Sequence, residues 1–194
     1  RKVTVTGNNG NKVYGEADPE LTATVAGTLG DDTVQYTLSR GEGEDVGHYS
    51  VIPTGEEIQG NYKVTYVAGT LTITSQSIDP GTEEKPNPDY KGVKVNRPSD
   101  EPYDGKGHKW IPTVTDKADK KLEAGKDYTV EYSTKNSTKN STKNFKDVGT
   151  IEVTITGKGN YSGTVTRTYK ITPAPLKVTT GKAEKVYDGK PLTN

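Results

Sequence analysis

The side chains with the best intrinsic chemistry for proton transfer are two histidines, His48 and His108. His48 follows Gly47 and precedes a strand-like run, and His108 lies in a Gly-His-Lys loop, so neither stands beside a patterned serine and acid. The chain has no cysteine, which removes thiolate nucleophiles, disulfides and thiolate metal ligands. Its glycines precede strands rather than helix starts, so no phosphate-binding loop is indicated. We therefore expect no catalytic residues and no cofactor, and predict that the protein is not an enzyme.

One aromatic group could bind a ligand. Trp110 is the single tryptophan, and together with Tyr103 and His108 it could form a stacking face for a sugar ring. The alternative is that Trp110 fills the core of a small module, because it flanks Ile111 at the start of a strand-like segment. The core role is the favoured interpretation.

Carboxylate pairs could bind Ca²⁺, which takes six to eight oxygen ligands. None of them shows the spaced Asp-x-Asp-x-Asp-Gly pattern, so solvated turns are the preferred interpretation and no metal site is predicted. The acidic candidates are Asp31-Asp32, Glu42 with Glu44-Asp45, Glu56-Glu57, and Asp116 with Asp119.

A Lys–Asn amide crosslink would need the two side chains to meet in a dry core. The sequence does not show that a lysine such as Lys94 meets an asparagine such as Asn160.

The elements that would carry these residues belong to a repeat. A Tyr-(Asp)-Gly turn recurs, and between its copies an Asp-Val-Gly and then a Gly-Asn-Tyr sequence follow in the same order. Such a repeat indicates one structural unit used more than once. The tyrosines of these turns are expected to be structural anchors, with half-buried rings and hydrogen-bonded or hydrated hydroxyls. They are Tyr14, Tyr62, Tyr103, Tyr161 and Tyr187.

The repeat divides the chain into four parts. Residues 1–75 form a first module and residues 76–88 a Pro-rich linker. Residues 89–175 form a second module, and residues 176–194 the truncated start of a third. The chain is therefore expected to be a fragment of a longer protein with neighbouring repeats.

The local pattern is that of β-strands. Alternation of valine, tyrosine and isoleucine with polar residues runs through both modules, and glycine-containing steps mark the turns. We predict an all-β fold of tandem immunoglobulin-like sandwiches. A β-grasp-like module is the alternative, and it needs a helix for which only residues 117–124 offer a place. The Ser133–Asn144 tract, Ser-Thr-Lys-Asn three times over, is predicted to be a mobile loop expansion.

Composition excludes several function classes. Formal net charge is zero, which argues against general binding to nucleic acid or anionic lipid. Only 28% of the residues are hydrophobic, and no stretch approaches the roughly 20 apolar residues that span a bilayer. We expect no nucleic-acid partner and no membrane insertion.

The first module resembles the MBG-type (YGX) domain of bacterial surface proteins. The resemblance is carried by Tyr14-Gly15, by Val46-Gly47-His48-Tyr49 and by the run from Gly60 to Ile73. The second module is similar to a related Tyr-x-Gly repeat of Firmicute (Gram-positive) surface proteins, through Tyr103-Asp104-Gly105-Lys106 and the run from Ile155 to Gly163. The Ser-Thr-Lys-Asn expansion departs from that pattern.

This resemblance implies tandem modules of a large extracellular protein, wall-anchored or secreted, that functions in cell adhesion. It implies no catalytic residues. We expect a non-catalytic stalk that projects a distal binding region. The alternatives are a module that itself binds host mucin, another host glycoprotein or a glycan, and an accessory module of a secreted carbohydrate-active enzyme.

Overall fold

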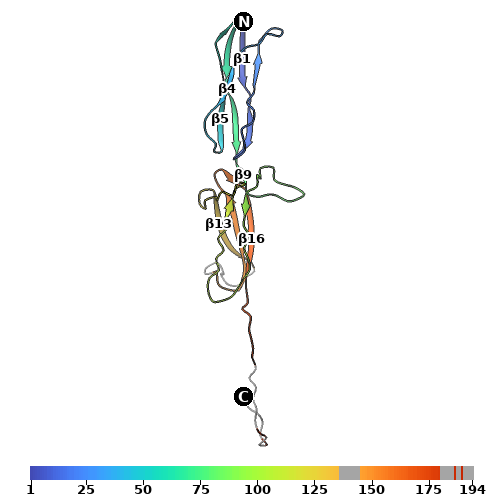
Figure 1. Cartoon of the computed structure of the whole chain (residues 1–194), viewed down its shortest axis with the longest axis vertical. Coiled ribbons are helices and arrows are strands. Elements are labelled where there is room, and N and C mark those ends of the chain that lie inside the picture. Colours follow the sequence, from blue (N-terminus) through green and yellow to red (C-terminus); the bar gives the residue numbers. More distant parts are fainter. Residues whose placement is uncertain (136–144, 180–185, 187–188, 190–194) are drawn as a thin grey trace.

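The structure is a computed structural model that describes residues 1–135, 145–179, 186 and 189. Throughout the described residues the regular structure consists of strands, so the all-β prediction is confirmed. Two β modules are stacked end to end along one long axis, with the N-terminus at the far end of the first module (Figure 1). The only segment with helical leanings, residues 117–124, contains a turn at residues 117–118 instead.

The first module consists of two four-stranded sheets. In each sheet one pair of neighbouring strands is parallel and the others are antiparallel. One sheet has the order β3 (Ala23–Ala26), β1 (Lys2–Gly7), β7 (Tyr62–Val67), β6 (Ile58–Gln59). The other has the order β2 (Gly10–Val13), β8 (Gly69–Thr74), β5 (Gly47–Thr54), β4 (Thr37–Arg40).

Two chain segments cross from one sheet to the other side by side. β1 continues into β2, and β7 continues into β8, so the parallel pairs of both sheets are made by the same two segments. The crossing brings Gly69 so close to Gly7 that a Cβ atom on Gly69 would overlap backbone atoms of Gly7 and Asn8. Close backbone approach of this kind requires glycine. The alternating side chains Val3, Val5 and Val64 then fill the core.

The second module has one large sheet and two small ones. The large sheet has the order β11 (Glu101–Pro102), β16 (Thr164–Thr172), β14 (Gly149–Gly157), β13 (Tyr128–Lys135). The small sheets pair β10 (Lys94–Val95) with β12 (Val114–Thr115), and β15 (Tyr161–Ser162) with β9 (Gln76–Ser77). Its core contains Ile78, Val93, Val114, Leu122, Tyr128, Ile151, Val153, Ile155, Tyr161, Val165, Tyr169 and Ile171.

The Pro-rich segment 76–88 begins inside the second module. Gln76 and Ser77 form β9, which runs parallel to β15, and Ile78 is fully buried in the second core. The middle of the segment forms a hairpin-like loop, in which the N–H of Thr82 donates to the carbonyl oxygen of Lys85 over 3.0 Å. Only Ser75 separates β8 of the first module from β9. The two modules are therefore joined by one residue rather than by a spacer.

The modules share the same connections at their lower ends. The N–H of Tyr14 donates to the carbonyl oxygen of Thr74 over 2.8 Å, and the N–H of Tyr103 donates to that of Thr172 over 2.8 Å. The register agrees as well, because Gly47 lies opposite Ile73 and Gly149 lies opposite Ile171. Tyr14 and Tyr103 are thus equivalent, as are the Asp-Val-Gly sequences 45–47 and 147–149.

Two sequence predictions fall largely outside the described residues. Of the Ser133–Asn144 tract, residues 133–135 are the last part of β13 and residues 136–144 lie outside the description. Of residues 176–194, the described ones are 176–179, 186 and 189, so the anchor role of Tyr187 also lies outside it.

The sheet crossing predicts the effect of one substitution. We expect Gly69→Ala to lower the free energy of unfolding of the first module by about 2 kcal/mol, because the new methyl group meets backbone that must move. Gly10→Ala is the matched control, since the nearest atom to its Cβ is a Leu71 side-chain carbon at 3.5 Å, an ordinary contact. Urea unfolding of both variants measures the difference. Equal stability of the two would show that the crossing has room for a side chain.

Candidate functional site: the joint between the modules

The end of the first module meets the second module through one asparagine. The Oδ1 atom of Asn160 accepts a hydrogen bond from the N–H of Val46 over 2.9 Å, and its Nδ2 atom donates to Oδ1 of Asp45 over 2.7 Å. The backbone carbonyl of Asn160 accepts from the N–H of Gln76 over 3.0 Å. The Gly-Asn-Tyr turn of the second module is therefore held at three points by the first module and its continuation.

An aromatic contact lies beside this turn. The rings of Tyr14 and Tyr161 meet edge to face, with centroids 5.5 Å apart and an interplanar angle of 76°. Tyr14 belongs to the first module, yet it packs against the core of the second. An ion pair between Lys91 Nζ and Glu16 Oε1 at 3.1 Å crosses the same boundary. Apolar packing, hydrogen bonding and charge thus act together at the joint.

A buried lysine holds the two turns of the first module that form its side of the joint. The Lys12 side chain is only 4% exposed, and its Nζ donates to Asp18 Oδ1 and Glu44 Oε2, each over 2.6 Å. It also donates to the carbonyl oxygen of Glu16 over 3.2 Å. Arg40 binds the same two carboxylates from the other side. Because Glu16 follows Tyr14 and Glu44 precedes Asp45, this four-charge network fixes both turns.

The charges of this network support each other. The hydrogen bond from Arg40, with that from Lys12 next, lowers the pKa of Asp18. The hydrogen bond from Lys12 lowers the pKa of Glu44 against a smaller effect of burial. Burial disfavours the charged form of Lys12, but its bonds to Asp18 and Glu44 together raise its pKa. Lys12 therefore remains an ammonium ion, which is not a nucleophile.

Tyr161 is the most strongly perturbed tyrosine of the described residues. It is 7% exposed, and burial, with smaller effects of Tyr14, Asp116 and Asp127, raises its pKa to about 12. A tyrosine in this environment is neutral at physiological pH. It acts as an apolar anchor for the joint rather than as an acid or base.

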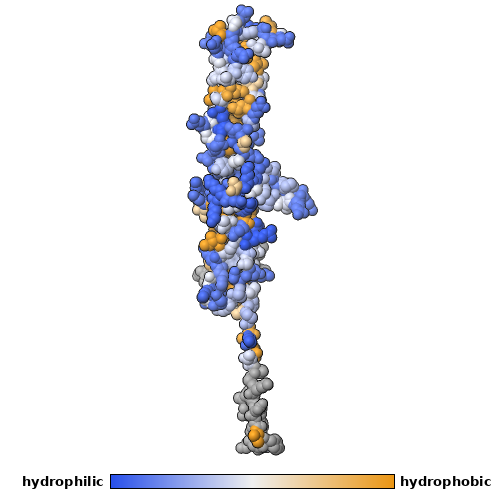
Figure 2. Space-filling model, viewed as in Figure 1, coloured by the Kyte–Doolittle hydropathy of each residue, from blue (hydrophilic) through white to orange (hydrophobic). Residues whose placement is uncertain are grey.

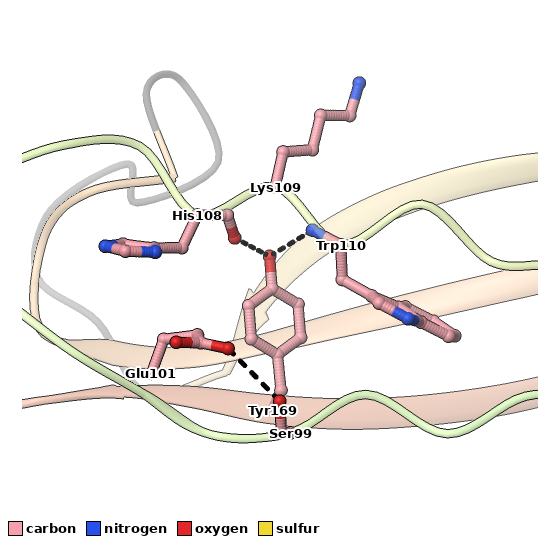
Figure 3. A pocket seen from close by; sticks show the side chains of 6 residues that line it. All are labelled: Ser99, Glu101, His108, Lys109, Trp110 and Tyr169. Atoms are coloured by element: carbon pink, nitrogen blue, oxygen red, sulfur yellow. Dashed lines mark hydrogen bonds between the residues drawn. The ribbon is translucent and has the colours of Figure 1, made fainter.

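The sugar-stacking candidates lie at the opposite end of the second module. His108 and Trp110 line a cleft of about 250 Å³ with Ser99, Glu101, Lys109 and Tyr169. The Tyr169 hydroxyl donates to the carbonyl oxygen of His108 over 2.8 Å and accepts from the N–H of Trp110 over 3.4 Å (Figure 3). The Trp110 ring is half-buried and packs against the second core.

The third candidate, Tyr103, is not part of the cleft lining. It is 39% exposed, and Lys146 Nζ lies 5.9 Å from the centroid of its ring. His108 Nε2 is 2.7 Å from Asp104 Oδ1, so its ring is held by a surface carboxylate. The structure brings His108 and Trp110 together at one cleft and leaves Tyr103 on the neighbouring surface.

The remaining candidate groups have local partners. His48 Nδ1 is 3.1 Å from Thr72 Oγ1, and Lys94 Nζ pairs with Asp119 Oδ1 at 2.8 Å rather than with an asparagine. Within the described part of the chain, no group of three or more His, Cys, Asp or Glu side chains is placed to hold a metal ion. No helix in that part is long and apolar enough to cross a membrane.

Sequence reasoning did not identify the joint. In the sequence Lys12 looks like an ordinary polar residue in a strand, and nothing local marks Asn160 as a contact to the first module. The available signal was the repeat itself, because the Tyr-Gly and Gly-Asn-Tyr turns recur at opposite ends of each module.

Comparison with known proteins gives a match to the first module. Residues 3–72 match the family model of the MBG domain (YGX type), which is a repeat-type domain of surface proteins. The match covers the first module and does not extend into the second. No match was found among the curated proteins.

The lysine network predicts a stability difference. We expect Lys12→Met to lower the free energy of unfolding of the first module by about 2 kcal/mol, because it leaves two carboxylates without one of their cations in a partly buried site. Lys63→Met is the matched control, since the Lys63–Glu57 pair is exposed on both sides and surface pairs contribute little. Thermal unfolding of both variants checks this. A loss as large for Lys63→Met would contradict it.

The raised pKa of Tyr161 predicts alkaline sensitivity of the second module. In the unfolded chain a tyrosine loses its proton near pH 10, whereas Tyr161 keeps it until about pH 12. The unfolded state therefore binds fewer protons between these values, and the free energy of unfolding falls as pH rises through this window. In Tyr161→Phe the fall should be smaller, measured as urea midpoints at several pH values. An unchanged pH profile in the variant would show that Tyr161 titrates normally.

Proposed function

We propose that this chain is a non-catalytic stalk segment of an extracellular bacterial surface adhesin. In this role β modules stacked end to end carry a distal binding region away from the cell wall, and the neighbouring repeats of the same chain are its direct partners. The observation that carries the proposal is the joint, in which Asn160 and Tyr161 of the second module are held by Asp45, Val46 and Tyr14 of the first.

The joint is suited to fixing the angle between the modules. Domains in one chain usually move relative to each other unless an interface restrains them. Here the chain passes from β8 to β9 through Ser75 alone, and hydrogen bonds act on both sides of that residue. The edge-to-face contact between Tyr14 and Tyr161 adds a further link between the modules. A rod with restrained joints reaches farther than a flexible chain of the same length.

We propose the immunoglobulin-like sandwich as the fold of the modules. The first module consists of two four-stranded sheets without a helix, which supports this assignment. One sheet buries Val3, Val5 and Val64, and the other buries Val51, Leu71 and Ile73. A β-grasp module would need a helix across its sheet, and residues 117–124 contain a turn at residues 117–118 and no helix.

Composition and family likeness support an extracellular site in a Gram-positive bacterium. The matched MBG domain is a repeat-type domain of surface proteins. The chain contains no cysteine and no methionine, so it lacks the sulfur side chains that oxidise most readily. The face drawn in Figure 2 is largely hydrophilic with small separate hydrophobic patches, as is suited to a rod in solvent.

The alternative functions have less support. The cleft beside Trp110 has a volume of about 250 Å³, below the roughly 300 Å³ at which ligand pockets begin. Trp110 itself contributes to the core, and Tyr103 lies outside the cleft lining. We therefore do not propose direct binding of host mucin or glycan by these residues, nor an accessory role in a carbohydrate-active enzyme.

Spin labels across the joint test the proposal. The chain has no native cysteine, so Thr65→Cys on β7 and Thr166→Cys on β16, both exposed, give one label on each module. We expect a narrow distance distribution by pulsed electron paramagnetic resonance. It should broaden in Asn160→Ala, which removes both side-chain hydrogen bonds to the first module. Thr129→Ala, an exposed change on β13, is the control. A broad distribution in the unmodified chain would refute a stiff stalk.

A further inference from the structure

The second module repeats, at its lower end, the surface that the first module uses in the joint. Tyr103 occupies the position of Tyr14. Each donates its N–H to the carbonyl oxygen of the last threonine of β8 or β16, the strand that pairs in parallel with the one before the tyrosine. The hydroxyl of that threonine, Thr74 or Thr172, also makes an equivalent contact, 3.3 or 3.4 Å from the carbonyl oxygen of Lys12 or Glu101. The same backbone arrangement is thus found at the lower ends of both modules.

The side chains that grip Asn160 also have counterparts. Asp45 and Val46, which bind its amide, correspond to Asp147 and Val148 just before β14. Tyr103 is 39% exposed, and Val148 is 48% exposed, close to the 42% of Val46, which contacts Asn160 through its backbone N–H. We call Tyr103, Asp147 and Val148 the lower docking face. In the first module the same positions contact the second module.

The chain leaving the second module has the donors that such a joint needs. In the joint, the N–H groups of Gln76 and Ile78 donate to carbonyl oxygens of Asn160 and Ser162. Counting from the equivalent threonines, their counterparts are Ala174 and Leu176, and the prolines of this stretch are residues 173 and 175. Proline lacks an N–H, so its placement at the alternate positions preserves both required donors.

Leu176 shows what should follow. Its counterpart Ile78 is fully buried in the second core, and Val3 takes the same place in the first core with 1% exposure. Leu176 is instead 87% exposed. The extended segment after β16 continues along the long axis of the two modules (Figure 1). Leu176 is therefore an exposed apolar side chain at a position that is buried in both modules.

We propose that the lower docking face binds the Gly-Asn-Tyr turn of a further β module, whose core begins at Leu176. The asparagine of that turn accepts from the Val148 N–H and donates to the Asp147 carboxylate, and its tyrosine ring meets Tyr103 edge to face. Such turns exist in this chain as residues 60–62 and 159–161, each with glycine at positive φ. The proposal rests on the stalk function, which it extends by naming the partner and its register.

A three-module chain tests it. Residues 1–175 are followed directly by a second copy of residues 78–172, so that Ile78 of the copy takes the place of Leu176. Labels at Thr166 and at Thr129 of the copy report on the new joint, and labels at Thr65 and Thr166 report on the original one; all three residues are exposed. We expect narrow distance distributions at both joints.

Two variants are expected to remove the narrow peak at the new joint alone. They are Asp147→Ala, which removes the carboxylate that accepts from the asparagine of the copy, and Asn160→Ala in the copy only. Asp31→Ala is the matched control, because Asp31 is an exposed carboxylate in a turn of the first module. It should leave both joints unchanged.

The outcomes separate the proposals. A broad distribution at the new joint beside a narrow one at the original joint would overturn the docking face and leave the stalk function standing. Broad distributions at both joints would overturn the stalk itself. Concentration-dependent association of the unextended chain in sedimentation, removed by Asp147→Ala, would assign the face to a second copy and overturn the covalent partner proposed here.

Discussion

The structure depends on the continuity of β8 into β9 through a single residue. Thr74 closes the last hydrogen bond of the first module, and Gln76 makes the first of the second. With only Ser75 between them, the chain has little freedom to separate the modules or to rotate one about the other. The side-chain contacts of Asn160 and Tyr14 then act on ends that are already close, so each costs little ordering entropy and holds the orientation.

The four-charge network holds the two turns of the first module that form the joint. Turns at the ends of a small module would ordinarily be its most mobile parts, because few apolar contacts hold them. Lys12 connects the turn after Tyr14 with the turn before Asp45 from a buried position. The two halves of the joint therefore move together. A hydrophobic core as small as that of the first module could not provide this connection alone.

The alternating valines and tyrosines made the all-β fold predictable. The joint was not, because Asn160 and Asp45 are distant in sequence and no local pattern links them. The Pro-rich composition of residues 76–88 also concealed β9, since Gln76 and Ser77 are polar yet buried. Their burial comes from parallel pairing with β15, which is a tertiary effect.

The two modules carry charged residues of opposite sign at two equivalent positions. Lys12 and Glu44 of the first module correspond to Glu101 and Lys146 of the second, so the signs are exchanged. In the first module the cation is buried between two carboxylates, whereas in the second Lys146 lies over the Tyr103 ring. The shared backbone therefore sets where the turns lie, and the charges that steady them differ from one module to the next.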